Sequence, residues 1–138
     1  YEGKKEEVSL QSEIEYLENY IELHKIRYHK SVDIQFEHRI QENDKIAPLL
    51  FIILLENAFK HGVDTLTEFA YIKMQLSSND NEIHFTIENN FDPDEISEQK
   101  GIGLENLKRR LTLTYPKQHQ FTISQKENTY KINLKITV

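Results

Sequence analysis

The sequence has 138 residues, of which 38% are hydrophobic and 29% are charged, which fits one soluble globular domain with a sizeable core. A net charge of −6 argues against a general nucleic-acid-binding protein, because phosphate backbones attract faces rich in lysine and arginine. The absence of cysteine excludes disulfides and thiolate chemistry, and no apolar run approaches the roughly 20 residues that span a bilayer.

The first predicted element is a helix over residues 8–28. Its stripe positions follow one another in steps of three and four, which is typical of one helical face. These positions are Leu10, Ile14, Leu17, Ile21, His24 and Tyr28. Ser9 is the expected N-cap residue. The stripe predicts either a core face or a dimer seam, and we favour the core.

A strand and a second helix are predicted next. Residues 32–40 alternate between apolar and polar side chains, which indicates a strand with one buried face. Pro48 is expected to open the helix, at a position that tolerates a missing N–H. The helix is apolar almost all round over residues 49–55, which predicts that it is buried. Gly62 is expected to end it as a C′ glycine.

The second half of the chain predicts two hairpins and a third helix. Residues 70–76 and 83–87 alternate like strands around turn residues at 78–81, and residues 90–100 read as a polar loop. A helix is expected from Gly103 to Tyr115, followed by a hairpin over residues 121–138. The order of elements predicts an α+β two-layer sandwich, with a mixed, mostly antiparallel sheet and helices on one face.

Polar residues interrupt the most apolar helix. Glu56 and Lys60 are four residues apart, as are Asn57 and His61, so each pair shares a helical face. One interpretation is an ion pair on a solvated stripe. The other is the wall of a nucleotide pocket, because an amide or carboxylate oxygen suits Mg²⁺ and lysine attracts phosphate. A carboxylate there could also polarise a water or a hydroxyl.

A second candidate element precedes the third helix. Gly101 and Gly103 would let the backbone approach a ligand, and the helix N-terminus would present free N–H groups to an anion. Two glycines alone are a weak signal, and a loop that merely needs positive φ is the more common explanation. Their occurrence together with the Glu56–Asn57 helix is much harder to obtain by chance.

Two segments resemble motifs of the histidine-kinase ATPase domain, within the group that includes gyrase, Hsp90 and MutL. Residues 55–62 (LENAFKHG) resemble the N box, and residues 101–111 (GIGLENLKRRL) resemble the second glycine box. Residues 9–28 and 46–50 (IAPLL) are similar to the lead-in of LytS-like sensor kinases. The resemblance implies a Bergerat-type sandwich, with residues 1–30 as a helical lead-in from the dimerisation and phosphoacceptor region. Residues 31–138 would be the ATP-binding catalytic domain.

The resemblance implies a cofactor pair, ATP and Mg²⁺, and a role for each residue of the N box. Asn57 would bind Mg²⁺. Glu56 would act as the base or orient a water. Lys60 and His61 would lie near the phosphates.

The resemblance also assigns the residues around the second glycine box. Gly101, Gly103 and Leu104 would form the end of the ATP lid, and Asn106 would lie beside the phosphates. Counting the strand alternation outward places Asn89 where the family has its adenine-binding aspartate. An asparagine oxygen can accept a hydrogen bond from adenine but lacks the charge that roughly doubles its strength. We therefore expect weaker nucleotide affinity or a relaxed pocket.

Two further features depart from the family pattern. Phe91 stands where the first glycine box has its first glycine. The six histidines are His24, His29, His38, His61, His84 and His119, and none lies in the context rich in Asn, Pro, His and Phe that surrounds the family's phosphoacceptor. The chain also begins at Tyr1 without methionine, which favours a fragment of a longer protein. The fragment is therefore not expected to autophosphorylate alone.

The resemblance implies a two-component sensor histidine kinase. Its partners would be a response regulator of the LytTR type and the phosphoacceptor region of the same or a partner protomer. It would be a homodimer and the cytoplasmic part of a membrane-anchored bacterial protein. The alternative is a degenerate, non-catalytic nucleotide-binding or dimerisation module. An ATPase of the gyrase–Hsp90 group is disfavoured, because the loop between Asn90 and Gly101 is short.

Overall fold

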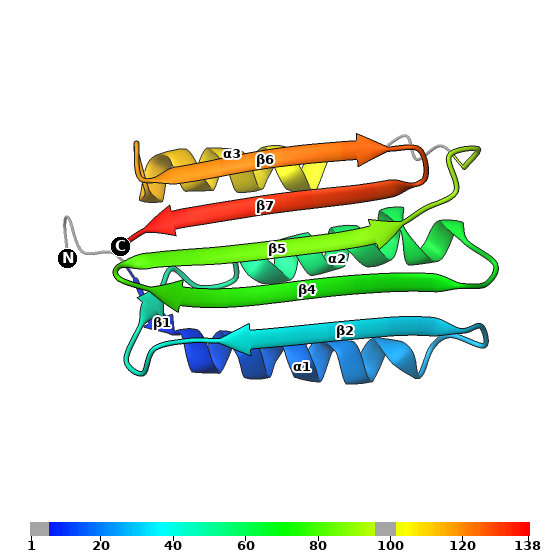
Figure 1. Cartoon of the computed structure of the whole chain (residues 1–138), viewed down its shortest axis with the longest axis horizontal. Helices are drawn as coiled ribbons and strands as arrows, with labels where there is room; N and C mark the ends of the chain where they lie inside the picture. The colour runs from blue at the N-terminus through cyan, green and yellow to red at the C-terminus, as the bar shows by residue number, and fades with distance from the viewer. Residues whose placement is uncertain (1–5, 96–101) are drawn as a thin grey trace.

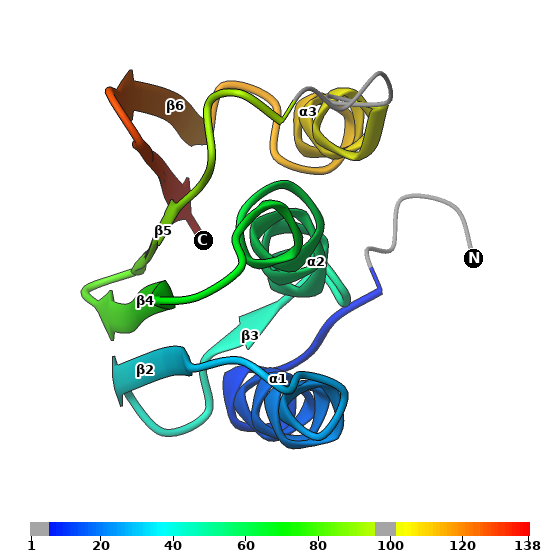
Figure 2. The ribbon, with the colours of Figure 1, turned by 90° about the vertical axis from the view of Figure 1, so that its right-hand side faces the viewer.

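Five strands form one sheet, and α-helices cover one of its faces while the other face stays open (Figures 1 and 2). The computed structural model describes residues 6–95 and 102–138. The strands of the sheet are β2 (Val32–Arg39), β4 (Ala70–Asn79), β5 (Glu82–Asn90), β6 (His119–Lys126) and β7 (Thr129–Thr137). Their order is β2-β4-β5-β7-β6, with β2 and β4 parallel and the other neighbours antiparallel. The predicted α+β sandwich is confirmed.

The first helix is shorter than predicted. It is α1 (Leu10–Lys25), so Tyr28 lies beyond its end. Ser9 is its N-cap residue, as predicted, and its hydroxyl accepts a hydrogen bond from the Ser12 N–H at 3.1 Å. Residues Val8–Ser9 form β1 instead of a helical turn and pair antiparallel with β3 (Lys45–Ile46). The stripe faces the core, since its first four members are buried: Leu10, Ile14, Leu17 and Ile21.

The second helix, α2 (Phe51–His61), begins three residues after the predicted start at Pro48. Tertiary contacts hold the preceding residues in a turn, because Leu49 has a φ of 62° and its N–H donates to Glu13 Oε1 at 2.9 Å. The carbonyls of Pro48 and Leu49 also accept hydrogen bonds from Arg110. A three-residue 3₁₀ helix, η1 (Val63–Thr65), follows α2.

The third helix is α3 (Ile102–Thr114), close to its predicted bounds. Both predicted hairpins also form. The β4–β5 turn places Asp80 and Asn81 at φ values of 47° and 68°, as a tight two-residue hairpin requires. None of the described helices is long and apolar enough to cross a membrane.

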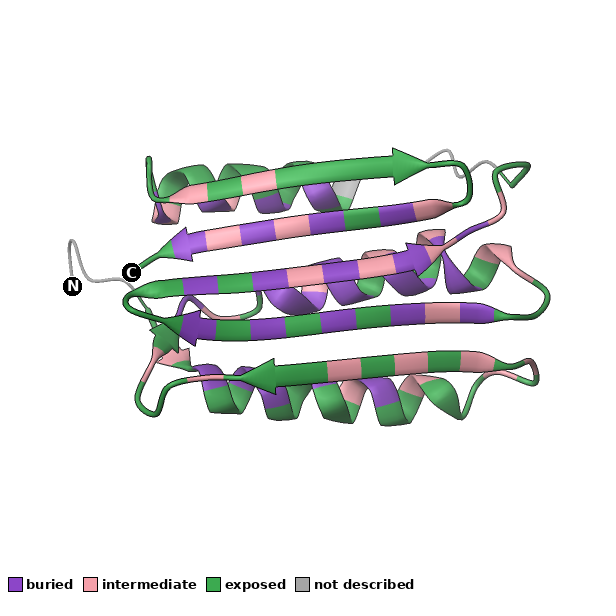
Figure 3. Cartoon of the chain, viewed as in Figure 1, coloured by how far each residue is buried: buried purple, intermediate pink, exposed green. Residues whose placement is uncertain are grey.

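The core lies between the helices and the inner face of the sheet. Along β4 and β5, buried and exposed residues alternate, and the edge strand β6 is mostly exposed (Figure 3). Phe51 of α2 stacks on Phe85 of β5 with ring centroids 4.7 Å apart. Because α1 and α2 run in the same direction and α3 returns, three ends meet at one end of the molecule, on the right in Figure 1. These are the last turns of α1 and α2 and the first turn of α3.

Candidate functional site

A cleft of about 580 Å³ lies where these three helix ends meet. Its volume is in the range of small-molecule sites. The described residues that line it come from α1, α2, η1 and the start of α3, with Arg27 just beyond α1. They are Tyr20, His24, Arg27, Ile53, Glu56, Asn57, Phe59, Lys60, His61, Asp64 and Gly103. The cleft therefore joins the two segments that the sequence singled out.

Helix α2 supplies one wall of the cleft because one of its faces is apolar and buried, whereas the other is polar. Leu54, Leu55 and Ala58 are buried against the core and fix the rotation of the helix. The cleft-lining polar residues lie on the remaining face, at spacings of three and four. They are Glu56, Asn57, Lys60 and His61. Lys60 and His61 also lie in the last turn, where cations complement the negative end of the helix dipole.

The start of α3 supplies the facing edge. Gly103 lines the cleft, and among the described residues a Cβ added there would meet only the Ile53 side chain, at 3.9 Å. The backbone at this helix N-terminus is therefore approachable by a ligand. Gly101 lies outside the described residues. Leu104 is 5% exposed and packs in the core, and Asn106 is exposed but does not line the cleft. A nucleotide could contact Leu104 only through its backbone.

Asn89 lies on the helix-facing side of β5, as the strand alternation predicts. It is 3% exposed, and its Nδ2 donates to the Asn90 carbonyl at 2.9 Å. A Cβ at Gly62 would lie 2.2 Å from this Nδ2 and 2.5 Å from the Ala58 carbonyl oxygen. Gly62 directly follows the last residue of α2, so the prediction that it ends this helix is confirmed, but its φ of −121° lies outside the left-handed region. Glycine is needed there because the end of α2 packs directly on Asn89.

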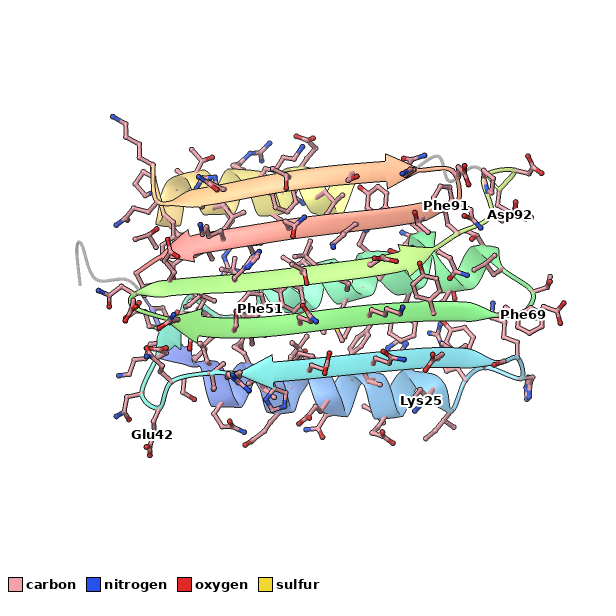
Figure 4. The ribbon with its side chains drawn as sticks, viewed as in Figure 1. Lys25, Glu42, Phe51, Phe69, Phe91 and Asp92 are labelled. Atoms are coloured by element: carbon pink, nitrogen blue, oxygen red, sulfur yellow. The ribbon has the colours of Figure 1, made fainter. Side chains whose placement is uncertain are left out.

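The segment after β5 is held by backbone hydrogen bonds where the family has its first glycine box. Phe91 is buried, and its N–H donates to the Asn128 carbonyl at 3.0 Å. The Asp92 N–H donates to Thr65 Oγ1 at 2.9 Å, and that hydroxyl donates to the Gly62 carbonyl at 2.7 Å. Phe91 and Asp92 lie just beyond the end of β5, beside the end of α2 (Figure 4). Phe91 and Asp92, which stand where the resembled family has glycine-box residues, are thus held by specific contacts in this structure.

Helix α1 forms a further wall of the cleft, which the sequence patterns did not predict. The rings of Tyr20 and His24 stack at 3.9 Å, and Phe59 of α2 lies 5.2 Å from the His24 ring. Burial, and then the nearby Glu56 carboxylate, raises the pKa of Tyr20 to about 12. Burial, and then the charge of Arg27, lowers the pKa of His24 from its usual value. The signal in the sequence was the polar end of the apolar stripe, where His24 follows Ile21.

The segment that follows α1 is hydrogen-bonded to η1 beside the cleft. Arg27 donates from Nη2 to the Tyr28 hydroxyl at 3.1 Å, and that hydroxyl donates to Asp64 Oδ1 at 2.6 Å. Arg27 and Asp64 also form an ion pair at 4.0 Å. Lys30 Nζ donates to the Val63 carbonyl at 2.5 Å. These contacts hold the segment that follows α1 against η1.

Sequence comparison relates the chain to sensor proteins. No family profile matches it. It is 26% identical over 143 aligned residues to "Sensor protein LytS" of Streptococcus agalactiae serotype V, which covers 94% of this chain and 25% of that protein. It is 25% identical to the LytS of Streptococcus mutans serotype c, over 82% of this chain and 22% of that protein. The chain thus spans about a quarter of the length of these relatives.

Solved structures share the fold. The nucleotide-free catalytic domain of histidine kinase ThkA superposes with a TM-score of 0.61 at 17% identity, covering 97% of this chain and 95% of that one. The mycobacterial sensor histidine kinase MprB gives a TM-score of 0.64 at 12% identity and covers 97% of both chains. The chain is thus similar in sequence to LytS sensor proteins along 94% of its length, and it shares the fold of histidine-kinase catalytic domains.

Proposed function

We propose that the cleft binds ATP with Mg²⁺ and that the domain is the catalytic part of a sensor histidine kinase. It would pass the γ-phosphoryl group to a histidine that is not among residues 1–138. The observation that carries the proposal is the meeting of Asn57 and Lys60 of α2 with Gly103 of α3 in one cleft. An amide oxygen, an ammonium group and a helix N-terminus are the groups that a magnesium–polyphosphate complex uses.

The phosphate end of the cleft suits phosphoryl transfer. This reaction needs positioning and charge stabilisation more than covalent chemistry from the protein. Asn57 is partly exposed toward the cleft and would hold Mg²⁺ through its amide oxygen. Lys60 and His61 would neutralise and orient the phosphates. Glu56 is exposed at the rim, where its carboxylate could accept a proton from the incoming imidazole or orient a water.

Asn89 is buried beneath Gly62 and does not line the cleft, so the adenine would have to reach it beyond the present cleft lining. Because Nδ2 of Asn89 donates to the Asn90 carbonyl, the amide oxygen is the group that could accept a bond from the adenine amino group. This bond would be neutral and about half as strong as one to a carboxylate. The same replacement supports a second candidate function, a signalling module that binds nucleotide weakly or not at all.

The proposed partners follow from the same function. We expect a phosphoacceptor region in the same or a partner protomer of a homodimer, and a response regulator of the LytTR type. One structural relative is histidine kinase ThkA in complex with the response regulator protein TrrA, with a TM-score of 0.62 at 16% identity. The parent protein would be anchored in a bacterial membrane with this domain in the cytoplasm.

Calorimetry with ATP, with and without Mg²⁺, tests the proposal. We expect binding that Mg²⁺ strengthens, and loss of that enhancement in Asn57→Ala. Asn19→Ala is the matched control, because Asn19 is an exposed asparagine of α1 that does not line the cleft. Unchanged magnesium dependence in Asn57→Ala would refute the metal-binding role. Absence of binding to ATP and ADP at millimolar concentration would favour the non-catalytic module.

A further inference from the structure

The lysine and the arginine that line the cleft come from different elements. Lys60 belongs to α2, and Arg27 follows the end of α1. The rings of Tyr20 and His24 lie on the Arg27 side, whereas Gly103 lies at the start of α3. Among the described lining residues, Arg27 and Lys60 are the only lysine or arginine side chains. An anion bound between these two elements would therefore meet one cation from each of them.

The ion-pair partner of Arg27 holds it weakly. Its ion pair with Asp64 is long, at 4.0 Å, and the two side chains are 56% and 41% exposed. Exposed ion pairs of this kind contribute little stability, so exchanging Asp64 for a phosphate oxygen would cost little. The planar guanidinium group can bind two phosphate oxygens at once, which lysine cannot do.

A purely structural role explains Arg27 less well. The segment after α1 is already fastened to η1 without it, because Lys30 Nζ donates to the Val63 carbonyl and the Tyr28 hydroxyl donates to Asp64. Arg27 adds to this network a charged group at the mouth of the cleft. Tyr28 also lies under the guanidinium, with the ring centroid 5.3 Å from Cζ, and so limits its orientations.

We propose that Arg27 is a second phosphate-binding residue, and that the helix before the sheet supplies part of the nucleotide site. This inference rests on the proposed nucleotide-binding function. Arg27 would contact the phosphates from the α1 side while Lys60 contacts them from α2. The anion would take the place of Asp64 as the partner of the guanidinium group.

The test compares nucleotides that differ in phosphate number. Isothermal calorimetry measures ATP, ADP and AMP binding to the whole chain and to Arg27→Gln. A lost hydrogen bond to a charged group predicts about a 10- to 100-fold weaker affinity for ATP, and a smaller loss for AMP. Arg27→Lys keeps the charge and should retain part of the ATP affinity. Circular dichroism melting confirms that both variants are folded.

Two control variants distinguish a direct contact between Arg27 and phosphate from a packing role of its neighbours and from a general effect of net charge. Tyr28→Phe removes the hydroxyl that bonds Asp64 but keeps the guanidinium group, so ATP affinity should stay within a few-fold of the unaltered chain. Lys25→Gln removes the same charge from the end of α1 at a residue that does not line the cleft (Figure 4). It should leave ATP affinity unchanged.

Three results would overturn the inference. An equal loss of ATP and AMP affinity in Arg27→Gln would mean that the residue only supports the cleft. A loss of ATP affinity in Lys25→Gln as large as that in Arg27→Gln would mean that any positive charge near the end of α1 has this effect. Unaltered ATP binding in Arg27→Gln would remove Arg27 from the site while leaving the proposed function intact. If the unaltered chain binds none of the three nucleotides, the proposed function fails first and takes this inference with it.

Discussion

Replacing Gly62 by alanine should destabilise the protein through contacts that cannot relax. The added Cβ would lie 2.2 Å from Asn89 Nδ2, 2.5 Å from the Ala58 carbonyl oxygen and 2.8 Å from the Asn90 carbonyl oxygen. Two of these three atoms belong to the backbone, so a change of rotamer cannot remove them. The backbone at the end of α2 must therefore change its conformation at Gly62 and move away from the end of β5.

General magnitudes limit the expected loss in the free energy of unfolding for Gly62→Ala. Overpacking a well-packed site costs about 1–3 kcal/mol, and the backbone contacts put Gly62→Ala in the upper half of that range. Alanine also restricts the unfolded chain, which returns about 0.4–1 kcal/mol only where the native backbone accepts it without strain. We therefore expect a net loss of about 2 kcal/mol, a large part of the roughly 5–15 kcal/mol that stabilises a typical domain.

Urea unfolding followed by circular dichroism measures this loss. Gly103→Ala is the matched control, because among the described residues a Cβ there meets only the Ile53 side chain, at 3.9 Å, and the position lies inside α3. It should be neutral or stabilising by up to about 1 kcal/mol, since alanine is the better helix former. A Gly62→Ala protein as stable as the unaltered chain, or an equal loss in both variants, would refute the packing argument.

Three further predictions concern single side chains. Tyr115→Phe should lower the free energy of unfolding by about 1–3 kcal/mol in urea titrations, because it removes the hydroxyl that accepts the buried Ala47 N–H at 2.9 Å. His24 has a lowered pKa, so its contribution to stability is present above pH 6.5 and is lost as the pH falls through its folded pKa. His24→Phe should therefore flatten the fall in melting temperature on acidification from pH 6.5, and an unchanged pH profile would contradict this. Asn89→Asp should destabilise the nucleotide-free protein, because a buried carboxylate would face the Asn90 carbonyl, and calorimetry should show tighter ATP binding if adenine lies there.

The sequence predicts the elements of this fold because their signals are local. Alternation over residues 70–76 and 83–87 identifies β4 and β5, and the turn residues between them identify the hairpin. The parallel pairing of β2 with β4 depends on how α2 crosses between them, which no short pattern encodes. The β1–β3 pair escaped prediction for the same reason, since its two strands have two residues each and lie far apart in the sequence.

The candidate site also has one part that the sequence predicts and another part that it does not. Helical spacing alone places Asn57 and Lys60 on one face of α2, so this wall was predictable. Arg27 was not predictable, because no local pattern places it beside Asp64, 37 positions later in the chain, at the same cleft. The role of Gly62 depends likewise on Asn89. Local sequence patterns therefore predict which side chains share one face of a helix. Which residues lie opposite that face depends on tertiary packing.

The last prediction concerns the division at residue 30. Residues 31–138 carry both motifs, yet α1 places Leu10, Ile14, Leu17 and Ile21 in the same buried cluster as α2 and the sheet. Burying an aliphatic side chain contributes about 1.5–3 kcal/mol, so the four together contribute about 6–12 kcal/mol, as much as a typical domain has in total. We expect residues 31–138 alone to lack a cooperative thermal transition, whereas the whole chain shows one by circular dichroism. A cooperative transition in the truncated protein would show that the lead-in only covers a domain that folds by itself. If the transition is absent, the helix before the sheet is as much a part of this domain as the helix that carries Asn57.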